Sequence, residues 1–391
     1  MTDYLSADEL MKHVKALSVD IGPRPPGSLE EAQARAYIRD VMKAHGLTDL
    51  HELPFTAPDS WGYAGTLPFV IAFAANMLGK GKMSRLVGAL ATLGAAFTLW
   101  KMFSAQRSPL EALVPNKPTA TLVFRVAAKN ETKHKLVLIG HTDTNKHRLT
   151  FMPQVKREMI PLFTYGLGAL VINGLAQLVG VTGLKIAEPL RQMSLLSVLA
   201  GIGIGVADEL GGFVDGANDN ATAVACLLGL GAKLQAQPLE NTEVWLAFTG
   251  AEESGCLGIH ALMDTYGAEL ANAWFLDFEM VGAGELVYVT EHSGFSYFNA
   301  YVPDDESLQW ALETARAHPE MSVRGAPMTI VEEIGALRGR GYRGICLAGQ
   351  GADGWLVNWH QYSDNIANIQ PEAIAKAARF AWAMMEKLDT K

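Results

Sequence analysis

The sequence predicts an α/β protein with a mixed, mostly parallel central sheet, helices on both faces, and an inserted hydrophobic helical unit. Short apolar runs typical of strands alternate with helical runs, which is the pattern of an α/β sheet. The 391 residues are 49% hydrophobic and only 19% charged, enough apolar material for a large core. Long uncharged segments interrupt the alternation twice and predict the inserted unit.

Two amphipathic helices are predicted at the start of the chain, over residues 6–18 and 28–46. The second opens with Ser28 followed three residues later by Glu31, a capping-box pattern, and ends at Gly46. The stretch IGPRPPGS between them predicts a rigid connector rich in turns.

Four apolar segments follow, arranged as two hairpins. Residues 60–79 and 159–184 carry no charge over 20 and 26 positions, and residues 86–100 and 192–207 carry none over 15 and 16 positions. A spanning helix needs about 20 residues, so the first and third segments qualify and the second and fourth are marginal. Buried helices of a soluble protein remain the alternative.

The other elements alternate along the chain. Strands are predicted over 120–127, 135–140, 243–248, 274–278, 286–290, 298–302 and 344–348. Helices are predicted over 220–235, 254–266, 306–317 and 371–388.

Polar residues of the metal-binding type break the apolar pattern in five places. They are His141 with Asp143, Asp219, Glu252 with Glu253, Asp277, and His360. Most follow or end an apolar strand, and ligands of an open α/β sheet bind at the carboxyl ends of its strands. Two imidazoles with several carboxylates suit a pair of divalent ions of the zinc type.

Each of these positions also has a purely structural reading. His141 alone fits a hydrogen-bonded loop residue, and Asp219 alone fits a helix cap. Glu252 and Glu253 fit carboxylates in the first turn of a helix. Asp277 is harder to explain in this way, because the flanks in WFLDFEM are buried and a buried carboxylate needs a partner.

The order HxD, GANDN, EE, D and H resembles the M28 family of co-catalytic zinc exopeptidases, which includes aminopeptidases and glutamate-carboxypeptidase relatives. The stretch GPRPPGSLEEAQARAYIRDVMKAHG is also similar to the opening of that family. The resemblance implies a zinc-exopeptidase fold, of the phosphorylase/hydrolase-like kind, and two Zn²⁺ ions per chain.

The resemblance also implies roles for the residues. His141 and Asp277 would bind one zinc ion, Glu253 and His360 the other, and Asp219 would bridge the two. Glu252 would be the general base. Asp143 would orient His141 from behind, and Asp364 is a further supporting residue or a plain turn residue.

The expected function is therefore a dinuclear zinc exopeptidase, with an aminopeptidase as the first reading. A carboxypeptidase or an N-acyl amino acid amidohydrolase with the same metals is the alternative. An acidic group such as Glu279, Glu332 or Glu333 would bind a substrate ammonium, and Arg338, Arg340 or Arg343 a substrate carboxylate. Retention of every expected ligand argues against a non-enzymatic pseudopeptidase.

The catalytic domain is expected to comprise residues 1–58, 105–158 and 208–391, with hairpin insertions at 60–104 and 159–207. The hairpins would contact a lipid bilayer as an anchor, or form an apolar vestibule for apolar peptides or N-acylated amino acids. A polar, acidic N-terminus favours a cytoplasmic catalytic domain, although the KGKMSR turn would then oppose the positive-inside tendency.

Charge and cysteine content bear on further partners and on disulfide bonds. The net charge of −9 and the lack of Lys/Arg runs exclude nucleic acid. The three cysteines are expected to be buried thiols. The sequence does not indicate an oligomeric state.

Overall fold

A single eight-stranded sheet forms the centre of the protein, in a computed structural model that describes residues 3–391. The strand order is β1-β2-β4-β3-β5-β8-β6-β7. The strands are β1 (Leu50–Ala57), β2 (Lys117–Val126), β3 (His134–His141), β4 (Thr242–Thr249), β5 (Trp274–Glu279), β6 (Glu285–His292), β7 (Arg324–Met328) and β8 (Ile345–Gln350).

The middle of the sheet is parallel and its flanks are mixed. Strands β4, β3, β5 and β8 run in one direction, so their carboxyl ends share one edge. Strand β2 pairs antiparallel with both β1 and β4, and β6 pairs antiparallel with β8 but parallel with β7. The predicted mixed sheet with helices on both faces is confirmed.

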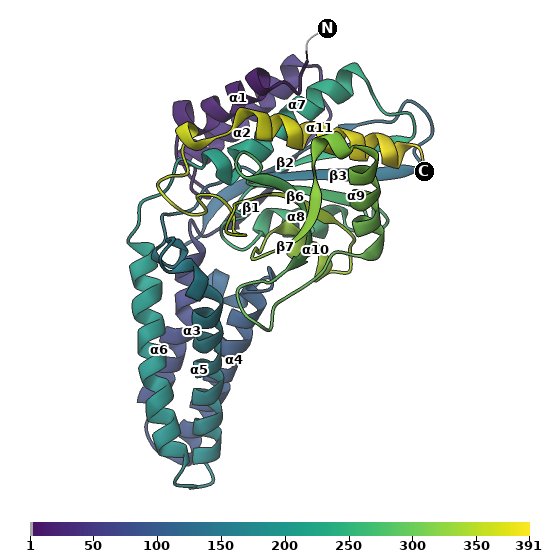
Figure 1. The fold of residues 1–391 in the computed structure, drawn as a ribbon. Coiled ribbons are helices and arrows are strands. Elements are labelled where there is room, and N and C mark those ends of the chain that lie inside the picture. Colours follow the sequence, from purple (N-terminus) through teal and green to yellow (C-terminus); the bar gives the residue numbers. More distant parts are fainter. Residues whose placement is uncertain (1–2) are drawn as a thin grey trace.

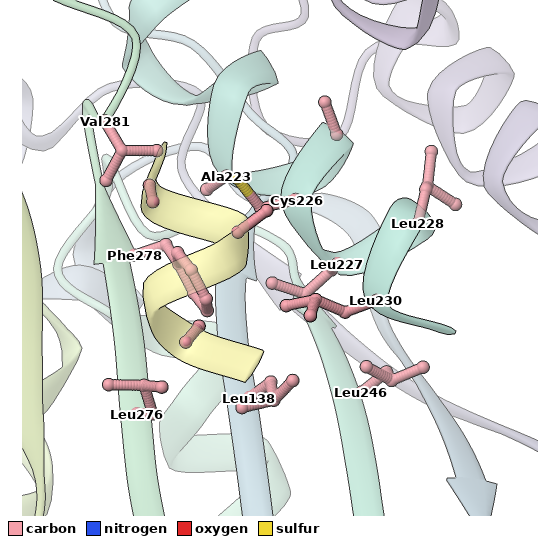
Figure 2. Close-up of a cluster of buried hydrophobic side chains, with 14 of the residues drawn as sticks. Leu138, Ala223, Cys226, Leu227, Leu228, Leu230, Leu246, Leu276, Phe278 and Val281 are labelled. Carbon is pink, nitrogen blue, oxygen red and sulfur yellow. The ribbon is translucent and has the colours of Figure 1, made fainter. Parts of the chain in front are cut away.

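Helices cover both faces of the sheet (Figure 1). Those of the α/β part are α1 (Ala7–Lys15), α2 (Leu29–Ala44), α7 (Thr222–Ala236), α8 (Leu257–Tyr266), α9 (Asp305–Ala317), α10 (Glu333–Arg338) and α11 (Pro371–Asp389). Strand residues alternate between two buried cores: Leu138 faces α7 and α11, whereas Val137 and Ile139 face α8 and α10. Figure 2 shows the first of these cores, where leucines of α7 meet Leu138 and Leu246.

Three elements differ from the sequence prediction. The expected strand over 298–302 is absent, and Tyr301 forms only an isolated bridge with His292. Strands β1 and β7 were not predicted; they contain Pro54 and Pro327 and lie at the two edges of the sheet, where a strand tolerates proline.

The four apolar segments form a helical bundle that projects from one end of the α/β part (Figure 1). Its helices are α3 (Trp61–Met77), α4 (Lys82–Met102), α5 (Met159–Gly180) and α6 (Ala187–Glu209). Each helix packs against the next along the chain, and α6 closes the ring against α3. The chain termini lie at the opposite end of the molecule.

Three bundle helices are long and apolar enough to cross a membrane: α4, α5 with its preceding turn, and α6. The sequence reading ranked these segments differently. Helix α3 is only 17 residues long and contains Pro68. Helices α4 and α6 are 21 and 23 residues long, because each continues beyond its uncharged stretch into residues that carry charge.

The bundle exposes many apolar side chains and buries a small polar cluster beside its apolar core. Most of the large apolar side chains that the described residues expose lie on these four helices, including Leu196 at 70% and Phe97 at 59% exposure. Inside, the buried Asn173 accepts hydrogen bonds from Asn76 at 2.8 Å and from Gln177 at 2.9 Å, and donates to Ser194 at 3.0 Å. Polar side chains thus join α3, α5 and α6 within the bundle.

Candidate metal centre

Most of the predicted metal-type residues converge at the carboxyl edge of the parallel strands, together with Glu279. His141 ends β3, and Glu252 and Glu253 follow the end of β4. Glu279 ends β5, and His360 lies in the loop after β8. Asp219 lies in the turn that leads into α7. Parallel pairing therefore brings together side chains from distant parts of the chain.

Two groups of ligand-type side chains share Asp219. In the first, Nε2 of His141 lies 3.2 Å from Oδ1 of Asp219 and 3.7 Å from Oε2 of Glu279. In the second, Nε2 of His360 lies 3.3 Å from Oδ2 of Asp219 and 3.2 Å from Oε2 of Glu253. Each oxygen of the Asp219 carboxylate thus faces a different histidine.

The chemistry of this donor set fits divalent cations. Nε2 of His141, Oδ2 of Asp219 and Oε1 of Glu253 are buried and have no hydrogen-bond partner. Burial lowers the pKa of His360, but Glu253 and Asp219 outweigh it and raise the pKa to about 8. Imidazole and carboxylate donors that surround one negative, buried space are those of a zinc-type site.

Asp277 does not join either group, contrary to the sequence expectation. It lies with Glu332 and Cys346, deeper in the sheet. Glu279, two residues further along β5, takes the position beside His141. Both side chains point to the same face of the strand, because side chains alternate with a period of two, and only Glu279 reaches the carboxyl end. Both residues lie near the end of the predicted strand 274–278, so the sequence carries no clear signal that distinguishes them.

Glu252 lies between the two groups without joining His360. Its Oε2 is 3.9 Å from Nε2 of His141, and its Oε1 accepts a hydrogen bond from Sγ of Cys256 at 3.2 Å. Burial raises the pKa of Glu252 well above its usual range; Glu253 adds to the rise and His141 opposes it.

Two buried carboxylates and an arginine fix the backbone of the site. Asp143 accepts the backbone N–H groups of Glu252 and Glu253 at 3.1 and 3.0 Å, and its Oδ1 lies 3.5 Å from Nδ1 of His141. Asp364 accepts the N–H of Asp219 at 3.1 Å. Arg24, which the sequence reading did not single out, is buried and donates to carbonyl oxygens on both sides of the site, Thr142 and Gly216 among them.

A chain of side chains joins the site to the bundle. Nδ2 of Asn145 donates to Oε2 of Glu253 at 2.5 Å and lies 3.1 Å from Nε2 of His360. Oδ1 of Asn145 accepts from Nε of Arg148 at 2.9 Å, and Nη1 of Arg148 donates to Glu209 at the end of α6. The orientation of the Asn145 amide is thus fixed by a residue that also contacts the bundle.

The cysteines are free and buried, as expected. Their surroundings are not all apolar, since Cys256 contacts Glu252 and Cys346 lies beside Asp277.

A pocket of about 60 Å³ opens onto this cluster. Asp219, Glu252, Glu253, Glu279 and His360 form its polar wall. The opposite wall comes partly from the bundle, through Trp61 and Phe103. The bundle is therefore part of the wall of this site.

Several solved structures share this fold over nearly their whole length. A zinc aminopeptidase from Bacillus subtilis matches with a TM-score of 0.59 and 14% identity over 99% of this chain and 96% of that one. A leucine aminopeptidase precursor from Bacteroides thetaiotaomicron matches with 0.59 and 15% over 98% and 97%. A glutaminyl cyclase from the same organism matches with 0.58 and 14% over 98% of each chain.

These likenesses establish the fold, that of the zinc aminopeptidases. By sequence, residues 203–385 match the model of peptidase family M28. This match agrees with the resemblance that the motifs implied, and together with the shared fold it supports a metallopeptidase. No curated protein matches the chain by sequence.

Proposed function

We propose that the protein is a dinuclear zinc exopeptidase, most simply an aminopeptidase, held at a membrane by its bundle. The observation that carries the proposal is the sharing of Asp219 between two triads of ligand-type side chains. His141, Asp219 and Glu279 would hold one ion, and Asp219, Glu253 and His360 the other. Glu279 thus replaces Asp277 in the ligand set.

Metal ions held there would supply a polarised water and an electrophile for the scissile carbonyl. The chain's own residues provide the proton transfer. Glu252, buried at the edge of both triads, takes the proton of the attacking water and returns it to the leaving amine. Asp143 holds the backbone of Glu252 and Glu253 in place during this transfer, through the two hydrogen bonds that it accepts.

The pocket supports an amino-terminal preference over a carboxy-terminal one. No Lys or Arg of the described residues lines the catalytic pocket, while four carboxylates do. The three arginines considered for carboxylate binding pair elsewhere: Arg338 with Asp304, Arg340 with Asp264, and Arg343 with Glu306. A substrate carboxylate would therefore find no cationic side chain among the described lining residues, which favours an amino-terminal preference.

A substrate panel tests the proposal. The purified, zinc-loaded protein is expected to release p-nitroaniline from leucine p-nitroanilide, to lose this activity on chelation, and to regain it with zinc. Full activity after the metal is removed and its absence verified would contradict the mechanism.

The second candidate function is hydrolysis of an N-acyl amino acid or a related amide by the same residues. The observation that favours it is the apolar wall formed by Trp61 and Phe103, which would suit an acyl group. N-acyl substrates in the same panel separate the two functions.

We also propose that residues 60–104 and 159–207 are insertions in the catalytic domain and that they enter the bilayer. Helix α6 supports this most directly, because only 11% of its most apolar window is buried. At about 1.5 Å per residue, its 23 residues would span about 35 Å, enough for a hydrocarbon core of about 30 Å. After a carbonate wash, the protein should remain in the membrane pellet; quantitative release would contradict insertion.

The catalytic domain is proposed to face the cytoplasm, where unpaired thiols such as its three cysteines are usual. The distal turn of the bundle carries Lys80 and Lys82, but Lys156 and Arg157 flank the catalytic end, so cationic residues mark both ends. A cysteine introduced at the exposed Glu320 should react with a membrane-impermeant maleimide only after cell lysis. Labelling in intact cells would show that the catalytic domain faces the outside of the cell.

A further inference from the structure

A second cavity lies inside the catalytic end of the bundle. Its volume is about 220 Å³, and residues of all four bundle helices line it, among them Phe69, Leu99, Phe163 and Ile204. Apolar cavities of about 150 Å³ already admit a benzene-sized ligand. This cavity is therefore large enough to hold part of an organic molecule.

The cavity adjoins the catalytic pocket. Trp61 and Phe103 line both spaces, so the two are separated by the same aromatic side chains. A molecule with its amide at the metal-type cluster would reach the bundle cavity by passing these rings. A short substrate side chain would not reach from the catalytic pocket into the bundle cavity. The arrangement therefore suits a substrate with an elongated substituent.

The cavity also reaches the outer surface of the bundle. Tyr165 on α5 is 76% exposed, and Ser197 and Ala200 on α6 are exposed, yet all three line the cavity. The same surface carries the apolar side chains that are proposed to face lipid. An amphiphile in the bilayer would therefore meet the opening directly.

The lining selects an alkyl chain over an apolar peptide. Most of the cavity wall is apolar, and Arg148 and Asp208 at its catalytic end are engaged by Glu209 and Thr150. A peptide backbone placed there would leave buried N–H and C=O groups without partners, at a cost of about 1–3 kcal/mol each. An alkyl chain carries no such groups and gains from burial.

We propose that the bundle cavity binds the alkyl chain of an amphiphilic amide, which enters from the bilayer and places its amide at the catalytic cluster. This inference rests on the amide hydrolysis proposed above and names the substrate class. The bundle would then serve as a substrate-binding element as well as an anchor.

The test uses the full chain in lipid nanodiscs and compares short and long substrates. One pair is acetyl and dodecanoyl p-nitroanilide; the other is alanine methylamide and alanine dodecylamide, with the chain on the amine side. Ala200→Trp places an indole ring at the opening of the cavity, and Leu199→Trp adds the same ring to the exposed face of α6 at a residue that does not line the cavity. A dodecanoyl probe with a terminal diazirine, mapped by mass spectrometry, reports binding without turnover.

We expect Ala200→Trp to lower kcat/KM at least about tenfold for a long substrate, with the short partner changed less than twofold. Leu199→Trp should change neither, and the diazirine should label cavity-lining residues in the wild type but not in Ala200→Trp. Equal rates for short and long substrates, with no labelling of the cavity, would overturn the inference and leave the hydrolase proposal intact. Labelling of the cavity without turnover of any substrate would instead support the binding site and contradict the proposed function.

Discussion

The α/β part and the bundle both have apolar cores, but they differ in the side chains that they expose and in the polar groups that they bury. In the α/β part, leucine, valine and phenylalanine side chains fill the two cores beside the sheet. In the bundle, Asn173 and Gln177 are buried while Leu196 and Phe97 are exposed. This apolar exterior supports the proposal that the bundle faces hydrocarbon while the α/β part faces water.

The metal-type cluster lies where these two regions meet. Its ligand-type side chains come from the α/β part, its pocket wall comes partly from α3 and the end of α4, and Asn145 and Arg148 connect the two. Substitutions on each side of this boundary test what each region contributes to turnover, metal binding and stability.

The largest effect is expected from Glu252→Gln in the α/β part. The amide keeps the shape of the side chain but cannot accept a proton, so kcat should fall about 10³-fold while the metal content stays unchanged. Initial rates and metal analysis of the same preparation check this. Turnover at the native rate would remove Glu252 from the mechanism.

The next comparison is between Glu279→Gln and Asp277→Asn, two residues apart on β5. Glu279→Gln should weaken metal binding more than about 100-fold, since even groups behind a ligand contribute 10–100-fold. Asp277→Asn should keep the metals, because burial, with Glu333 and Glu332 adding to it, already raises the pKa of Asp277 well above its usual range. Competition with a chelator measures the metal affinities of both variants. A larger loss of affinity in Asp277→Asn than in Glu279→Gln would show that Asp277 is the ligand.

A smaller effect is expected from Asn145→Ala, at the boundary between the regions. Loss of the amide frees Glu253 and His360 from one of their contacts, which should lower kcat/KM about 10-fold. Asn130→Ala is the matched control, because this amide is exposed and donates to Glu240 instead of to a residue of the site, and it should leave kcat/KM unchanged. Equal effects of the two substitutions would show that Asn145 has no positioning role.

The smallest effect is expected inside the bundle, from Asn173→Leu. The substitution removes the hydrogen bonds to Asn76, Gln177 and Ser194, and a membrane-embedded hydrogen bond contributes only about 0.6 kcal/mol on average. The thermal midpoint in nanodiscs should fall by a few degrees with kcat/KM preserved. A large loss, with aggregation, would indicate that water rather than lipid surrounds the bundle.

Much of this architecture follows from the sequence pattern, and the exceptions have physical causes. Buried parallel strands such as β3 and β4 are continuous apolar runs, so they are recognised readily. The edge strands β1 and β7 contain prolines and are half exposed, so their sequences lack the continuous apolar run by which a buried strand is recognised. The side chains of Asp277 and Glu279 share one face, and only the end of β5 in three dimensions distinguishes them. The roles of Arg24 and Asn145 depend on contacts between distant loops, which spacing does not reveal.

The central claim is that one carboxylate, Asp219, joins two metal-binding groups at the boundary of the bundle and the sheet. Metal analysis of the purified full chain tests it most directly, with Asp219→Ala as its partner. We expect two zinc ions per wild-type chain and none retained in Asp219→Ala. A wild-type protein that retains less than one ion per chain in zinc-containing buffer, or a variant that keeps both, would contradict the account.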